Sequence, residues 1–190
     1  PTGISVPFDE IVYLLENIPE DTILVLDEAY HEFANPNDDT RTLQLQARFP
    51  NLVITRTFSK IYGLASLRLG YAIAAPEIIE LLIRVQPPFT VNTPVMSAAF
   101  AALDDLDFVK QTQDLTQKGM QQLKTGLDAL GFHSLPSWCN FITMNCGAKR
   151  AEIYEKLLEK GVIVRPLQGY DMPNYLRVSI GTYEQNARFL

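Results

Sequence analysis

Residues 23–27 read Ile-Leu-Val-Leu-Asp, an unbroken apolar run that ends at the carboxylate of Asp27. Apolar residues without alternation predict a strand that is buried on both faces, as in a parallel sheet flanked by helices. A second run of this kind, residues 52–54, leads through a short polar stretch to Ser59 and Lys60. We therefore expect an α/β fold whose sheet is mostly parallel.

Polar side chains follow both apolar runs. In an open α/β sheet, ligands bind beyond the carboxyl ends of the strands. Two neighbouring strand ends would bring the carboxylate of Asp27, the phenol of Tyr30 and the amine of Lys60 to one crevice.

A pyridoxal phosphate site needs these three groups. An amine forms a Schiff base with the cofactor aldehyde and later moves a proton. A carboxylate beside the pyridine nitrogen keeps it protonated, so that the ring accepts electrons. A phenol hydrogen-bonds the ring hydroxyl.

The cofactor phosphate needs hydroxyl groups and a cation. The guanidinium fork of an arginine matches a phosphate well, and the candidates are Thr57, Ser59 and Arg68. Plainer interpretations exist: hydroxyls after a strand often satisfy turn amides, an aspartate such as Asp27 can cap a helix, and a single lysine is usually a solvated surface residue. The joint spacing of these residues favours the cofactor site.

The segments Leu26–Tyr30 and Thr57–Lys60, followed by Arg68, resemble fold-type I aminotransferases. In that family the tyrosine follows the aspartate by three residues, the lysine follows a hydroxyl residue by three, and the arginine follows the lysine by eight. All three spacings hold in this chain. Pro1–Gly3 is similar to the end of a longer signature of that family. The segment Tyr175–Thr182 resembles the family segment whose arginine binds the acidic group of the substrate. Within the family, Gly161–Pro166 followed by Leu176–Val178 is most similar to histidinol-phosphate aminotransferases.

This resemblance implies a function. Lys60 would be the catalytic residue of a pyridoxal-phosphate-dependent aminotransferase, and Arg165 and Arg177 would bind the acidic groups of its substrates. The implied reaction transfers an amino group between histidinol phosphate and 2-oxoglutarate, giving glutamate, in L-histidine biosynthesis. The implied protein is a cytoplasmic homodimer. Alternatively, Arg165 and Arg177 point to solvent and pair with carboxylates, worth about 0 to 1 kcal/mol each. Arg56 is expected to be structural.

The resemblance covers essentially the whole chain and implies part of a fold-type I transferase. The remainder of a large cofactor-binding domain with flanking helices would span residues 1–91, a long bridging helix 92–130, and a small, incomplete α+β domain 131–190. Residues 35–39, rich in Asn, Asp and Pro, predict a loop. Because the chain opens inside a family signature, we expect a carboxyl-terminal fragment that is inactive alone and associates with itself.

Other functions fit the same sequence. The protein could be another fold-type I member, such as an aromatic aminotransferase or a phosphothreonine decarboxylase. It could be the sensor domain of a transcription regulator, which requires a DNA-binding winged helix upstream. It could also be a scaffold whose site has decayed, although the intact set Asp27, Tyr30, Lys60 and Arg68 argues against that.

Composition excludes several classes of partner. A net charge of −6 and a pI near 4.9 argue against nonspecific nucleic-acid binding. Two cysteines are too few for a disulfide framework, and they suggest reduced thiols in a cytosolic protein. No apolar run approaches the ~18 residues of a membrane helix. The two histidines have no partners at ligand spacing, so we expect no metal site.

Overall fold

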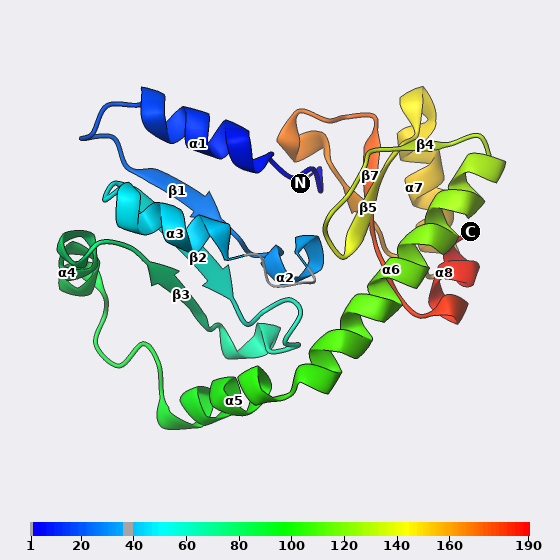
Figure 1. Cartoon of the computed structure of the whole chain (residues 1–190). Coiled ribbons are helices and arrows are strands. Elements are labelled where there is room, and N and C mark those ends of the chain that lie inside the picture. Colours follow the sequence, from blue (N-terminus) through cyan, green and yellow to red (C-terminus); the bar gives the residue numbers. More distant parts are fainter. Residues whose placement is uncertain (1, 36–39) are drawn as a thin grey trace. The chain divides into compact units, whose positions relative to one another are not determined.

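The computed structural model describes residues 2–35 and 40–190 (Figure 1). Pro1 and residues 36–39 of the expected loop lie outside the described residues. Contacts within the chain divide it into two compact units, Val6–Lys110 and Pro1–Ser5 with Gln111–Leu190. The division into 1–91, 92–130 and 131–190 remains a proposal about domains.

The unit Val6–Lys110 is built on a three-stranded sheet of order β1-β2-β3. Its elements are α1 (Phe8–Asn17), β1 (Leu24–Asp27), α2 (His31–Ala34), α3 (Arg41–Arg48), β2 (Leu52–Thr57), the 3-10 turn η1 (Ala65–Leu67), β3 (Gly70–Ile73), α4 (Pro76–Val85) and α5 (Thr93–Asp104).

The sheet is mixed. β1 and β2 run parallel, with Asp27 opposite Thr55, whereas β2 and β3 run antiparallel, with Thr57 opposite Gly70. A parallel pairing needs a crossover connection, usually through a helix. The segment between Thr57 and Gly70 contains only the 3-10 turn η1, so the chain returns antiparallel. The sequence had predicted a mostly parallel sheet. These three strands instead form a mixed sheet, with one parallel and one antiparallel pairing.

The expected burial of β1 on both faces is wrong. Leu24 and Leu26 are half-buried and pack with Ile11 and Leu15 of α1 in one core cluster, which also contains Leu45 of α3. Val25 points the other way and is 58% exposed. An unbroken apolar run predicts a strand with two apolar faces, but whether both are covered depends on what packs there. In the described part of the chain, nothing buries Val25.

Residues 92–130, expected to form one helix, form two. α5 ends at Asp104, and α6 (Leu106–Ala129) begins after Asp105. The Asp105 carboxylate accepts a 3.0 Å hydrogen bond from the Phe108 amide, an N-terminal cap that starts the new helix. The boundary between the two units falls within α6, after Lys110.

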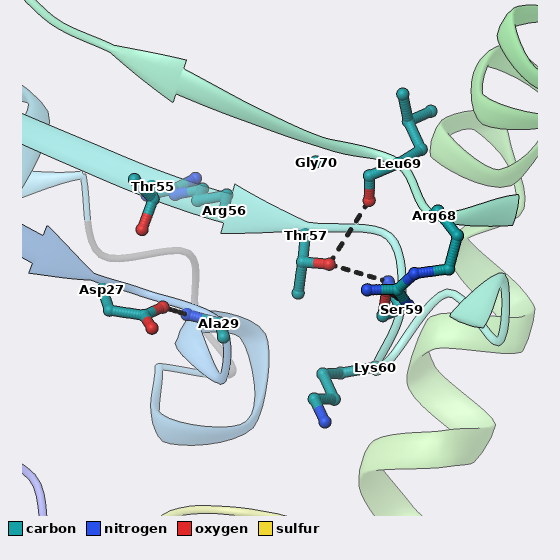
Figure 2. Close-up of a pocket in the computed structure, with 10 residues that line it drawn as sticks. All are labelled: Asp27, Ala29, Thr55, Arg56, Thr57, Ser59, Lys60, Arg68, Leu69 and Gly70. Atoms are coloured by element: carbon teal, nitrogen blue, oxygen red, sulfur yellow. Dashed lines mark hydrogen bonds between the residues drawn. The ribbon is translucent and has the colours of Figure 1, made fainter. Parts of the chain in front are cut away.

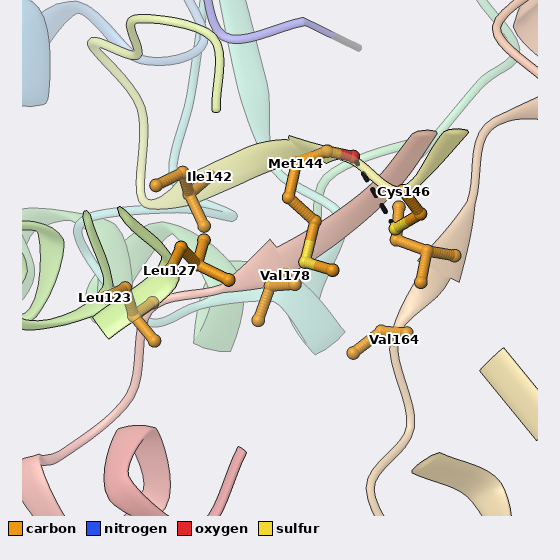
Figure 3. Packing of buried hydrophobic residues seen from close by; sticks show 8 residues of the cluster. Leu123, Leu127, Ile142, Met144, Cys146, Val164 and Val178 are labelled. Atoms are coloured by element: carbon orange, nitrogen blue, oxygen red, sulfur yellow. Dashed lines mark hydrogen bonds between the residues drawn. The ribbon is translucent and has the colours of Figure 1, made fainter. Parts of the chain in front are cut away.

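The second unit is a small α+β layer. Its antiparallel sheet has the order β4-β5-β7-β6. Its elements besides α6 are β4 (His133–Ser134), β5 (Phe141–Asn145), the 3-10 turn η2 (Gly147–Lys149), α7 (Arg150–Glu159), β6 (Arg165–Pro166), the 3-10 turn η3 (Gln168–Tyr170), β7 (Tyr175–Ser179) and α8 (Tyr183–Phe189). Leu123 and Leu127 of α6 pack on Ile142, Met144 and Val178 of the sheet (Figure 3).

In the described residues, no helix is both long enough and apolar enough to cross a membrane.

Candidate active site

A pocket of about 380 Å³ lies at the carboxyl ends of β1 and β2 (Figure 2). It is lined by Asp27, Ala29, Thr55, Arg56, Thr57, Ser59, Lys60, Arg68, Leu69 and Gly70. The parallel pairing of β1 with β2 explains its position, because both strands end at the same edge of the sheet. Figure 2 shows Asp27 on one side of the pocket, and Ser59, Lys60 and Arg68 on the other. The pocket therefore brings together five of the six residues predicted to bind a cofactor.

Tyr30, the sixth, does not line the pocket but contacts a residue that does. It precedes α2, and its ring lies 5.2 Å from the Nζ atom of Lys60. A cation at this distance over an aromatic face is attracted to the ring. The Lys60 side chain is otherwise exposed, so the Tyr30 ring helps to define where its amine lies.

Asp27 is held by its own turn. Its Oδ1 atom accepts a 3.0 Å hydrogen bond from the amide of Ala29. This bond helps to orient the carboxylate and uses one of its acceptor positions. A carboxylate has two oxygens and about four acceptor positions, so others remain. The exposed carboxylate keeps acceptor capacity for a ligand in the pocket.

The three residues predicted to hold a phosphate differ in their contacts. The Thr57 hydroxyl donates to the Leu69 carbonyl at 3.3 Å and accepts from the Ser59 amide at 3.0 Å. Its only proton is thus used within the loop, as the plainer interpretation predicts. Arg68 donates to the Ala65 carbonyl at 2.8 Å, and a second, long contact of 3.5 Å reaches the Ser59 hydroxyl. Ser59 and Arg68 are therefore better candidates than Thr57 for holding a phosphate.

The backbone around Arg68 is strained and tightly packed. Arg68 adopts a left-handed conformation, with φ 54° and ψ 42°. Only glycine adopts this conformation without cost, and such strain is typical of functional sites. At Gly70, a Cβ atom would lie 2.8 Å from the carbonyl oxygen of Arg56, so a side chain there would push the two strands apart.

A buried polar cluster beside the pocket was mostly missed from the sequence. Arg56 was expected to be structural, and it forms a buried ion pair with Glu28. Burial, the largest influence, lowers the pKa of Arg56, but the hydrogen bond and charge of Glu28, together with Tyr71, outweigh it and raise the pKa. Glu28 directly follows Asp27 and Arg56 directly precedes Thr57, a pattern that could have indicated the pair.

Arg165 and Arg177 lie in the second unit and line a pocket of about 600 Å³. The other residues around it are Ile163, Val164, Pro166, Gln168, Gly169, Tyr170 and Ser179. The two arginines are directly opposite on β6 and β7, an arrangement of like charges that is destabilising. No ion pair to either is found within residues 2–35 and 40–190. An anion in this pocket would relieve the repulsion.

Comparisons with known proteins agree with this geometry. Residues 1–190 match the model of the family described as aminotransferase class I and II. The chain is 53% identical, over all 190 residues, to histidinol-phosphate aminotransferase 2 of Legionella pneumophila strain Lens, of which it covers 52%. It is 48% identical to histidinol-phosphate aminotransferase 1 of Dechloromonas aromatica, again over its whole length and 52% of the relative.

Solved structures show the same fold. The histidinol-phosphate aminotransferase of Sinorhizobium meliloti in complex with pyridoxal-5'-phosphate matches with a TM-score of 0.90 and 30% identity, over 100% of this chain and 52% of that one. The L-threonine-O-3-phosphate decarboxylase of Porphyromonas gingivalis matches with a TM-score of 0.81 and 26% identity, over 100% and 59%. The fold-type I class expected from the sequence is confirmed.

The chain spans about half the length of the curated relatives it matches. The family match, however, covers every one of its residues. The chain belongs to the aminotransferase class I and II family.

Proposed function

We propose that the protein containing this chain is a pyridoxal-phosphate-dependent aminotransferase that acts on histidinol phosphate and 2-oxoglutarate. The observation that carries the proposal is the pocket at the ends of β1 and β2, where Asp27, Ser59, Lys60 and Arg68 meet. The relatives named above, up to 53% identical, support the choice of substrate.

The donor set of the pocket fits this cofactor. A phosphate would be held by the Arg68 guanidinium and the Ser59 hydroxyl, which are 3.5 Å apart. The Thr57 hydroxyl supports this end of the pocket from within the loop rather than as a free donor. Asp27, across the pocket, would hold the proton of the pyridine nitrogen. Lys60 would supply the amine, with Tyr30 beside it.

Each residue then has one task in the reaction. When bound, the cofactor supplies an aldehyde that takes up the amino group and a ring that accepts electrons. Once its amine is free, the Nζ atom of Lys60 would take the proton from the substrate α-carbon as a general base and return it as an acid to complete the amino transfer. Asp27 would keep the ring nitrogen charged, and Tyr30 would donate to the oxygen on the ring. Arg68 and Ser59 would hold the phosphate end in place.

The pocket around Arg165 and Arg177 would bind the acidic groups of the two substrates in turn. A phosphate and a carboxylate both accept paired hydrogen bonds from a guanidinium, so one pair of arginines can serve both halves of the reaction. The opposed arrangement of these cations supports the proposal, because an anion bound between them would relieve their repulsion.

The remaining features of the proposal follow from the family resemblance. They are a cytoplasmic location, a role in L-histidine biosynthesis and a homodimeric assembly. The net charge of −6 supports the absence of a nucleic-acid partner. We also propose that no membrane partner is involved.

The test is an assay of the whole protein, meaning the longest natural polypeptide that contains this sequence. With pyridoxal phosphate, histidinol phosphate and 2-oxoglutarate, we expect glutamate to form. A parallel assay with O-phosphothreonine measures release of carbon dioxide. Carbon dioxide without glutamate would replace the proposed activity by the decarboxylase. Absence of both products, with cofactor bound, would contradict the substrate assignment.

A further inference from the structure

A buried charged cluster lies beside the pocket at the ends of β1 and β2. The side chains of Glu28 and Arg56 are only 9% and 10% exposed. The Nε and Nη2 atoms of Arg56 both lie 2.9 Å from the Oε2 atom of Glu28. The buried ring of His31 joins them, with Nε2 3.3 Å from Arg56 Nη2 and Nδ1 3.4 Å from Glu28 Oε2. Because arginine has only donors, Nε2 of His31 is the acceptor of this contact.

The cluster connects the segments that carry the proposed cofactor ligands. Glu28 follows Asp27 in the chain, and Arg56 stands four residues before Lys60. The Glu28 amide also donates to the Thr55 carbonyl at 2.9 Å, and the His31 amide donates to the Glu28 carbonyl at 3.0 Å. The ion pair thus joins the carboxyl end of β1 to that of β2, immediately next to the pocket that Arg56 itself helps to line.

Stability alone does not explain such a pair. Removing two charges from water costs about as much as their attraction returns, and apolar residues of similar volume often serve the fold equally well. The ion pair adds a fixed geometry, because two nitrogens of the planar guanidinium, Nε and Nη2, converge on one oxygen of Glu28. Burial lowers the pKa of the Arg56 guanidinium, and the hydrogen bond and charge of Glu28, together with Tyr71, outweigh that effect and raise it.

We propose that Glu28 and Arg56 are positioning residues, whose buried ion pair sets the spacing between Asp27 and Lys60 across the pocket. This inference rests on the proposed function, because the spacing matters only for a cofactor held between the two side chains. A displacement of about 1 Å at a reacting centre costs on the order of 100-fold in rate. Two ligands on separate strands need a connection that excludes such a shift.

The test compares the whole protein with the double variant Glu28→Leu/Arg56→Met, which replaces both charges by apolar groups and leaves neither partner unpaired. We expect its melting temperature to fall by a few degrees, because the buried ring of His31 loses its contacts with both side chains. We expect hydrogen exchange to accelerate at the amides of Glu28 and His31 but not at Val53 and Ile54 in the middle of β2. We expect kcat to fall by about 10- to 100-fold, with KM changed far less.

The control is the exposed pair Glu152–Lys156 on α7, whose side chains are 58% and 66% exposed. Glu152→Leu/Lys156→Met should change neither hydrogen exchange near the pocket nor kcat.

Unchanged hydrogen exchange at the amides of residues 28 and 31 in the first double variant would overturn the inference, whether or not the protein is an aminotransferase. Faster exchange with an unchanged kcat would overturn it as well. A parent that binds no pyridoxal phosphate would instead overturn the proposed function, while the exchange data would still decide whether the ion pair holds the strand ends.

Discussion

The Nζ atom of Lys60 lies 5.2 Å from the centre of the Tyr30 ring. The two residues come from different strand ends, Tyr30 from the segment after β1 and Lys60 from the loop after β2. A cation–π contact at a partly exposed site is worth about 0.5 to 1 kcal/mol. That is enough to favour one position of a lysine amine that is otherwise exposed. The phenol of Tyr30 is then next to the proposed reacting group.

Arg68 is expected to stabilise cofactor binding and not the fold. Arg68→Gly relieves a left-handed conformation that costs a non-glycine residue about 1 to 2 kcal/mol. It also makes the unfolded chain more flexible, by about 0.5 to 1 kcal/mol, and it removes the hydrogen bond to the Ala65 carbonyl, worth about 0.5 to 1.5 kcal/mol. The free energy of unfolding should therefore change by less than about 1 kcal/mol. The affinity for pyridoxal phosphate, measured by fluorescence titration, should fall by at least about 10-fold.

Arg68→Lys is the matched control, because it keeps the charge but loses the fork. An intermediate affinity is expected. If Arg68→Gly binds the cofactor as tightly as the parent, Arg68 does not hold the phosphate.

Gly70 is expected to be intolerant of a side chain. In Gly70→Ala the new Cβ atom would lie 2.8 Å from the Arg56 carbonyl oxygen, a backbone atom that cannot rotate away. We expect a loss of about 1 to 3 kcal/mol in the free energy of unfolding, measured with urea. Gly169→Ala is the control, since nothing lies within 4 Å of its added Cβ. Equal stability of the two variants would refute the close approach of β2 and β3.

Arg165 and Arg177 are expected to act on substrate binding. Arg177→Gln removes one charged hydrogen-bond donor, so KM for histidinol phosphate should rise by about 10- to 100-fold. The variant also loses the contact of the Arg177 guanidinium with the Phe141 ring, 4.8 Å away, which offsets the relief of two opposed like charges. Its free energy of unfolding should therefore change by less than about 1 kcal/mol. Arg165→Gln should also raise KM for histidinol phosphate. Arg84→Gln, at an exposed position of α4, should leave KM unchanged.

Cys146 is expected to make stability depend on pH in the alkaline range. Burial raises the pKa of its thiol to about 11, with Arg150 offsetting part of this effect. An unfolded thiol has a pKa of about 8.5, so the folded state holds the proton more tightly. Its contribution, on the order of 3 kcal/mol, is present below pH 8.5 and is lost as pH rises towards 11. The slope of unfolding free energy against pH should flatten in Cys146→Ala but not in Cys139→Ala.

The sequence was enough to predict which polar residues lie at strand ends. It was not enough to predict how distant segments pack against one another. Asp27 ends an apolar run, and Lys60 follows the next run after a short polar stretch, so their place at or just beyond strand ends followed from the chain itself. Val25 shows the limit, because an apolar residue does not reveal which of its faces will be covered. The break at Asp105 had a visible capping residue, but an apolar pattern that continues across it masked the signal.

The same limit applies to the polar contacts. Thr57 stays a predicted phosphate ligand, but its hydroxyl donates to the Leu69 carbonyl, a partner twelve residues away that the sequence did not indicate. Glu28 and Arg56 are separated by 28 residues, and only the parallel pairing of β1 with β2 brings them together. Spacing within a segment predicted which side chains line the pocket, and contacts between segments show which of their atoms already have a partner.

The central claim is that Lys60 is the residue to which the cofactor bonds in the pocket at the ends of β1 and β2. The whole protein is incubated with pyridoxal phosphate, reduced with borohydride, digested and analysed by mass spectrometry, in parallel with Lys60→Ala and the exposed control Lys124→Ala. We predict that the parent and Lys124→Ala carry the reduced cofactor on Lys60, and that Lys60→Ala carries none. A reduced cofactor on a different lysine of the parent, or an equal yield in Lys60→Ala, would contradict the account.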